Sequence, residues 1–111
     1  MVIQIGKLSR ILKALGDPNR LGIVLFIGKE SRSVTEIINT MDLPQTLVSF
    51  HLRTLREAGI VATDRDGPFI YYRLSDTALM DILAKFAQQG ASQEALTEEP
   101  RKLMGKVKKM R

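Results

Sequence analysis

The strongest structural signal in this 111-residue chain is the segment SVTEIINTMDLPQTLVSFHLRTLREAGIV, residues 33–61. Ser33 stands three residues before Glu36, and this spacing is typical of two side chains that cap a helix start reciprocally. A tight connection through Pro44 leads to a second helix, which we expect over residues 45–58 and which a glycine closes. The segment therefore predicts two helices joined by a short turn, the arrangement of a helix-turn-helix.

After this segment the spacing of apolar residues changes from the helical period to the strand period. Residues 60–63 and 69–74 are two β-rich runs joined by Asp64-Arg65-Asp66-Gly67-Pro68. An Asp-Gly turn between two such runs predicts a β-hairpin, with Arg65 at the turn. Alternation along the second run places one set of side chains towards the core: Ile70, Tyr72 and Leu74.

Three further helices are predicted around this central part. The first covers residues 3–15 with an apolar stripe, and the second, about 18–29, is apolar nearly all round, so we expect it to be the most buried element. The last, about 76–89, begins at a Ser75 or Asp76 cap. One side of that helix is apolar: Leu79, Ile82, Leu83 and Phe86. Four helices, two strands and a helix predict a mainly α-helical winged helix-turn-helix with a small β-hairpin.

The charge of the chain is concentrated at one end. The net charge is +5, but residues 101–111 hold six of the 17 Lys and Arg residues and no acid, so residues 1–100 carry 11 basic against 12 acidic residues. We expect one folded domain over residues 1–89, followed by a polar linker and basic tail over 90–111. Because the domain is close to neutral, only a motif can indicate that it binds nucleic acid.

The composition excludes several kinds of chemistry. Without cysteine the chain forms no disulfide, thiolate metal site or catalytic thiol, and its single histidine, His51, cannot build a histidine-rich metal cluster. It has no glycine-rich phosphate loop, so we expect neither an enzyme nor a cofactor. No apolar run resembles a signal peptide or a membrane helix. We therefore expect a cytoplasmic protein with no membrane partner.

The helix over residues 45–57 has two distinct faces on a helical wheel. Val48, Leu52 and Leu55 form a buried stripe, and amide, hydroxyl and guanidinium groups lie opposite. Such groups suit base edges and phosphates of double-stranded DNA, and a basic residue of the hairpin could reach a neighbouring groove. The predicted DNA-binding residues are Gln45, Thr46, Ser49, Phe50, His51, Arg53 and Arg65.

Two alternatives stay open for this face. His51 lies at the edge of the buried stripe, where a lone histidine is more often a hydrogen-bonded structural residue than a ligand. Phe50 is a large aromatic on an outer face, which could contact a thymine methyl, stack on another protein, or be covered by the domain itself. The second function considered is therefore a protein-interaction module that uses the outer face of this helix.

The first and last helices carry more apolar residues than peripheral helices of so small a domain need. An exposed apolar patch of this kind marks an interface, and a two-fold homodimer is the commonest arrangement. The predicted interface residues are Ile5, Leu8, Ile11, Leu12, Leu79, Leu83 and Phe86. The alternative is that both helices pack only on their own core.

Three segments together resemble the ArsR/SmtB-type winged helix-turn-helix repressors: LKALGDPNRLGIVLFI (12–27), the segment 33–61 quoted above, and DRDGPFIYYRLS (64–75). The resemblance covers residues from about 11 to 83. It implies a homodimeric regulator that occupies an operator, with its fourth helix in the major groove and its terminal helices as the dimer interface.

The chain departs from this family where many members bind their inducers. Residues 33–37 (SVTEI) hold no cysteine, and no histidine follows Asp76, so neither of the family's usual metal-sensing sites can form. Position 50, commonly polar in the family, is Phe50 here, which leaves the details of base readout open. The inducer is unknown, and an organic small molecule, a partner protein or none at all stay open.

Overall fold

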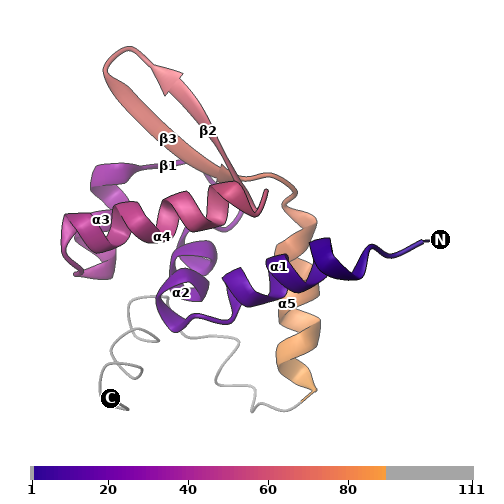
Figure 1. Cartoon of the computed structure of the whole chain (residues 1–111). Coiled ribbons are helices and arrows are strands. Elements are labelled where there is room, and N and C mark those ends of the chain that lie inside the picture. The colour runs from indigo at the N-terminus through magenta and orange to yellow at the C-terminus, as the bar shows by residue number, and fades with distance from the viewer. Residues whose placement is uncertain (1, 90–111) are drawn as a thin grey trace.

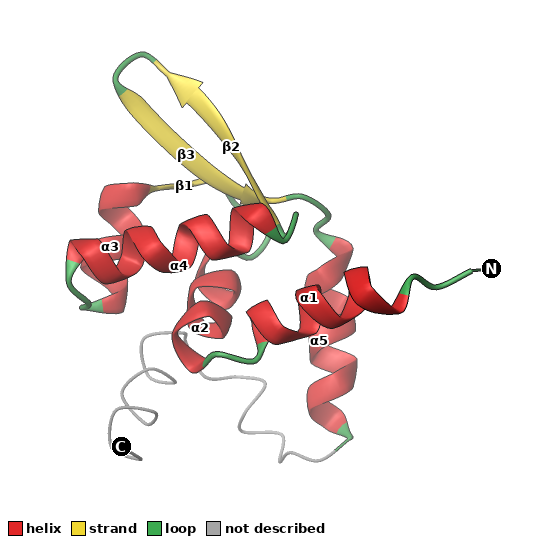
Figure 2. Cartoon of the chain, in the orientation of Figure 1, coloured by secondary structure: helices red, strands yellow, loops and turns green. Residues whose placement is uncertain are grey.

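The computed structural model describes residues 2–89, so the predicted linker and basic tail over 90–111 lie outside the described residues. The elements follow in the order α1 (Ile5–Leu15), α2 (Pro18–Ile27), β1 (Arg32–Ser33), α3 (Val34–Met41), α4 (Gln45–Glu57), β2 (Val61–Asp66), β3 (Phe69–Leu74) and α5 (Ala78–Gln88). Strands β2 and β3 project from the helices as a wing (Figure 1), and Figure 2 shows that the rest of the described chain is mainly helical. The predicted winged helix-turn-helix is confirmed.

The helix starts are stabilised as the sequence predicts. The backbone N–H of Arg20 donates to Asp17 Oδ2 at 3.1 Å, and proline occupies the first turn of α2. At the start of α3, the Glu36 N–H donates to Ser33 Oγ at 3.1 Å and the Ser33 N–H donates to Glu36 Oε1 at 3.4 Å. This reciprocal pair confirms the capping box. Gly59, with φ +77°, adopts a left-handed conformation two residues after the end of α4, next to the C-cap Ala58.

The core lies between α2, α3, α4 and the base of the sheet. Ile23, Val24 and Ile27 of α2 have no exposed surface, and α2 has more buried residues than any other described helix, as predicted. The buried residues that the other elements contribute include Ala14, Leu15, Ile37, Met41, Val48, Leu52, Leu55, Val61 and Leu74. The helix-turn-helix is therefore held against α2 and the sheet by one continuous apolar cluster.

The sheet has three strands in the order β1-β3-β2, one more strand than predicted. Arg32 pairs with Tyr72 and Ser33 with Tyr71, both antiparallel. A two-residue strand of polar residues leaves no periodic signal in the sequence. β1 connects the start of α3 to the wing.

The wing is longer than predicted, and its turn lies elsewhere. β2 extends to Asp66, which pairs with Phe69, so the turn consists of Gly67 and Pro68. Gly67 has φ +60°, a conformation that glycine adopts without strain. Arg65 pairs with Ile70 inside the hairpin, and the prediction that Arg65 lies at the turn is wrong. Aspartate is uncommon in strands, which is why the sequence indicated a loop here.

Three expectations about burial and capping also need correction. Ile70 is exposed, because the wing extends beyond the core at that point, whereas Leu74 at its base is buried. In α5, Ile82 and Phe86 are 59% and 73% exposed, so the side predicted to face the core does not do so along its whole length. The N-cap residue is Thr77, although the Asp76 carboxylate accepts a hydrogen bond from the Ala78 N–H at 2.9 Å.

Candidate nucleic-acid interface

Helix α4 presents the two faces that its sequence predicts. Val48, Leu52 and Leu55 are buried in the core. The side chains exposed on the outer side include Gln45, Thr46, Ser49, Phe50 and Arg53. They combine hydrogen-bond donors, acceptors and one cation on a single rigid helix. Phe50 is 53% exposed, so the interpretation that the domain covers it is wrong.

His51 connects α4 to the start of α2 from inside the domain. Its side chain is buried, and Arg20 Nη1 donates to His51 Nδ1 at 3.1 Å. Nδ1 is thus an acceptor, because a guanidinium can only donate. Nε2 lies 3.4 Å from the side-chain nitrogen of Asn19 and 3.9 Å from Asp17 Oδ2.

Arg20 extends this connection to a third helix, because its Nε donates to the backbone carbonyl of Ala14 at 2.7 Å. One buried network therefore joins α1, α2 and α4. It agrees with the structural interpretation of His51, which is only 4% exposed. Sequence reasoning did not find these partners of His51, because they lie about 30 residues away in the chain.

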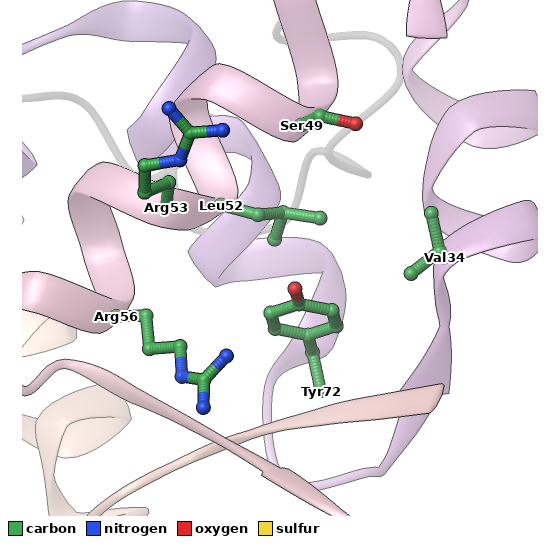
Figure 3. Close-up of a pocket in the computed structure, with 6 residues that line it drawn as sticks. All are labelled: Val34, Ser49, Leu52, Arg53, Arg56 and Tyr72. Atoms are coloured by element: carbon green, nitrogen blue, oxygen red, sulfur yellow. The ribbon is translucent and has the colours of Figure 1, made fainter. Parts of the chain in front are cut away.

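A hollow of about 230 Å³ lies between the outer part of α4 and the sheet. Figure 3 shows the side chains that line it, which are Val34, Ser49, Leu52, Arg53, Arg56 and Tyr72. We call this the α4–sheet hollow. Arg56 is absent from the residues predicted from sequence, since only the folded position of the sheet shows that its flank of α4 faces a cavity. Its spacing of three residues from Arg53 on one helix was the available signal.

The charged side chains of the wing are partly neutralised by an ion pair between its two strands. Arg73 Nε donates to Asp64 Oδ2 at 2.8 Å across the two strands. Arg65 is exposed, and Asp66 beside it has no ion pair within residues 2–89. Phe69 is exposed at the end of the wing, a feature that sequence reasoning overlooked. The wing thus offers one free guanidinium together with apolar surface.

The predicted dimer residues divide into two groups. Ile11, Leu79 and Leu83 are partly buried against the domain's own core. The other four are exposed: Ile5, Leu8, Leu12 and Phe86. Ile5 is 81% exposed, which is unusual for an isoleucine on an ordered helix. The apolar residues of α1 and α5 are therefore only partly covered by residues 2–89.

Two kinds of feature are absent from residues 2–89: a cluster of metal-binding side chains and a helix that could span a membrane. Within this range no three His, Cys, Asp or Glu side chains gather where they could hold a metal ion. None of the described helices has the length and apolarity needed to cross a membrane.

Comparison with known sequences matches the region that contains this interface. The family described as a helix-turn-helix domain matches residues 15–64. The HTH-type transcriptional repressor SmtB of Mycobacterium tuberculosis is 41% identical over 75 residues. These residues make up 68% of the chain and 56% of SmtB, so the chain spans little more than half the length of this relative.

Comparison with solved structures gives longer matches. NolR from Sinorhizobium fredii is 34% identical with a TM-score of 0.69, and the match covers 79% of this chain and 89% of NolR. The homodimeric winged helix-turn-helix DNA-binding domain of Mb0332 from Mycobacterium bovis, described as a possible ArsR-family transcriptional regulator, is 26% identical with a TM-score of 0.68. That match covers 77% of this chain and 81% of the Mb0332 domain.

Proposed function

The chain belongs to the ArsR/SmtB family of winged helix-turn-helix transcriptional regulators, and from this premise we propose that it binds double-stranded DNA as a homodimer and represses transcription by occupying an operator. The observation that carries the proposal is the exposed polar face of α4, which lies within the helix-turn-helix and beside the projecting wing.

Helix α4 has the shape and chemistry to read base edges. An α-helix with its side chains is about 10–12 Å across, and the major groove of B-DNA is about 12 Å wide. Gln45 can pair bidentately with adenine and Arg53 with guanine, and the hydroxyls of Thr46 and Ser49 can serve bases or phosphates. The buried contacts of His51 hold the helix in a fixed orientation, as specific readout requires.

The uncovered apolar residues of α1 and α5 supply the dimer interface in this proposal. A two-fold dimer presents two copies of α4, and such a dimer reads a palindromic site whose half-sites lie about one helical turn apart. The homodimeric state of the Mb0332 domain supports this arrangement. The folded domain over residues 1–89 would then contain both the DNA-binding and the dimerisation surfaces.

Selection of binders from random duplexes tests the proposal. We expect a two-fold symmetric consensus, and we expect Gln45→Ala and Arg53→Ala each to weaken binding to it by about 1–3 kcal/mol. Lys29→Ala, an exposed site outside the proposed surface, serves as the control and should bind as the wild type does. Recovery of no consensus at moderate salt would overturn the proposal.

We further propose that any inducer is not a metal held by Cys or His ligands, because the family's sensor positions lack these residues. Elemental analysis of the purified protein, paired with a test of whether metal ions release it from DNA, checks this point. The alternative function, a protein-interaction module that uses Phe50, finds no support in the proteins compared above.

A further inference from the structure

We propose that the α4–sheet hollow is a binding site for one oxyanion of the phosphate class. Two sources could supply this ligand: a phosphate of the duplex backbone or free phosphate in solution. The duplex source rests on the proposed function, whereas binding of free phosphate does not depend on it.

The open hollow is lined by polar side chains from two elements, with the apolar Val34 and Leu52 beside them. Helix α4 contributes Ser49, Arg53 and Arg56, and β3 contributes Tyr72. In Figure 3 the Tyr72 hydroxyl points towards α4, and the Arg56 side chain extends from α4 towards the sheet. The volume of about 230 Å³ leaves room for a hydrated phosphate group.

No carboxylate of residues 2–89 compensates the charge of the hollow. Its lining contains two guanidinium groups, two hydroxyls and no carboxylate. Within residues 2–89, neither Arg53 nor Arg56 forms an ion pair or a side-chain hydrogen bond. Arg32 and Arg73, by contrast, each have a carboxylate partner, Arg32 at 3.6 Å and Arg73 at 2.8 Å. In Figure 3 the Arg56 guanidinium extends towards the sheet, whereas the Arg53 guanidinium extends away from Tyr72. The free guanidinium of Arg56 therefore favours an anion in the hollow, and its planar donor array matches phosphate oxygens bidentately.

The position of the hollow explains why a duplex phosphate would reach it. If α4 enters the major groove and the wing reaches the neighbouring minor groove, the sugar–phosphate strand between the two grooves must cross between α4 and the wing. The hollow occupies this gap. Arg56 and Tyr72 would then hold the backbone in register and carry no sequence information, a role distinct from base readout by Gln45.

Titration of the full-length protein with inorganic phosphate, at an ionic strength held constant with chloride, tests the site without DNA. We expect saturable shifts of the Ser49 and Tyr72 backbone amide resonances, with at least about fivefold weaker binding in Arg56→Gln. Arg10→Gln on α1 is the matched control, because it removes the same charge from an exposed position outside the hollow. Tyr72→Phe keeps the packed ring, removes the hydroxyl and should weaken phosphate binding less.

The duplex source is tested by the salt dependence of binding to a labelled duplex that carries the selected site. The slope of log K against log salt concentration is negative, and loss of one phosphate contact reduces its magnitude by about 0.9, so we expect this reduction for each protomer of Arg56→Gln. The selected consensus should stay the same, since phosphate contacts do not read sequence. Arg10→Gln should leave the slope unchanged.

The outcomes separate the two sources from each other and from failure of the proposed function. Phosphate-induced shifts with an unchanged slope assign the site to a free oxyanion, even if the protein selects no DNA consensus. A slope of smaller magnitude without shifts assigns it to the duplex, and both results together assign it to both sources. Arg56→Gln that matches Arg10→Gln in both measurements would overturn the site, while a consensus selected by the wild type would still support the proposed function.

Discussion

Helices α2 and α5 are both rich in apolar residues, yet they differ sharply in how much of their surface is buried. Ile23, Val24 and Ile27 of α2 have no exposed surface, whereas α5 has no buried residue and leaves Ile82 and Phe86 largely exposed. The apolar residues of α2 form the interior of one chain. In α5, Leu79 and Leu83 pack partly against the core, whereas Ile82 and Phe86 are left uncovered by residues 2–89 and in the proposed dimer would meet a second copy of the chain.

The exposed surface of α4 also differs from that of α1 and α5 in the kind of residue it carries. Along α4 the outer face is polar apart from Phe50, whereas along α1 and α5 much of the uncovered surface is apolar. Polar side chains can serve duplex DNA, and apolar side chains gain free energy only by burial. Both surfaces are exposed in one chain, but their chemistry favours different partners.

Phe86→Glu should have the largest effect on dimerisation, because it removes apolar surface from the exposed side of α5. Each dimer loses two aromatic side chains, and burial of one contributes about 1.5–3 kcal/mol, so we expect the dimer dissociation constant to rise at least about 100-fold. Sedimentation equilibrium measures this change. Lys85→Glu changes the charge of a neighbouring exposed position and is the control. A Phe86→Glu protein that dimerises as tightly as the wild type would exclude this part of α5 from the interface.

Ile23→Ala tests how much the buried helix α2 contributes to the stability of the folded chain. Removing a fully buried isoleucine leaves a cavity in the core, so we expect the free energy of unfolding to fall by about 3 kcal/mol. Urea denaturation in a Phe86→Glu background keeps dimerisation out of the measurement. In that background Ile82→Ala should cost less than about 0.5 kcal/mol, because it changes an exposed site. Similar losses for the two variants would contradict the comparison.

His51→Ala tests whether α2 also holds α4 in place. The substitution leaves buried polar groups of Asn19 and Arg20 without their partner, so we expect stability to fall by about 1–3 kcal/mol. A double-mutant cycle with Asn19→Ala should give a coupling of at least about 0.5 kcal/mol, since the two side chains share one network. Independent effects would mean that the two side chains do not stabilise the fold together.

Much of the fold could be predicted because its signals are local. The capping pair of Ser33 and Glu36, the Asp17-Pro18 helix start and the apolar stripe through Leu52 each depend on residues a few positions apart. The exposed polar face of α4 followed from the same periodicity. Such features need no knowledge of how distant segments meet.

The features that the sequence did not indicate depend on tertiary pairing. Strand β1 consists of two polar residues and exists because it pairs with β3. Arg56 lines a hollow only because the sheet folds beside α4. The position of Arg65 depends on how far β2 and β3 stay paired beyond the core, and the partners of His51 lie about 30 residues away. The spacing of neighbouring residues in the sequence indicates none of these tertiary contacts.

The smallest expected effect concerns the wing, where an arginine is neutralised by the protein itself. The Asp64–Arg73 pair is exposed, and exposed pairs contribute about 0.2–1 kcal/mol, so Arg73→Ala should barely change the unfolding midpoint in urea. The substitution leaves the Asp64 carboxylate unneutralised near the proposed DNA surface, and we expect DNA affinity to fall about two- to threefold at low salt and to recover as salt screens the charge. Asp64→Asn combined with Arg73→Ala should restore most of the affinity.

Because Arg73 already has a carboxylate partner and Arg56 has none within residues 2–89, Arg56→Gln should weaken DNA binding more than Arg73→Ala. The reverse order would mean that the wing, and not the α4–sheet hollow, is the main electrostatic contact.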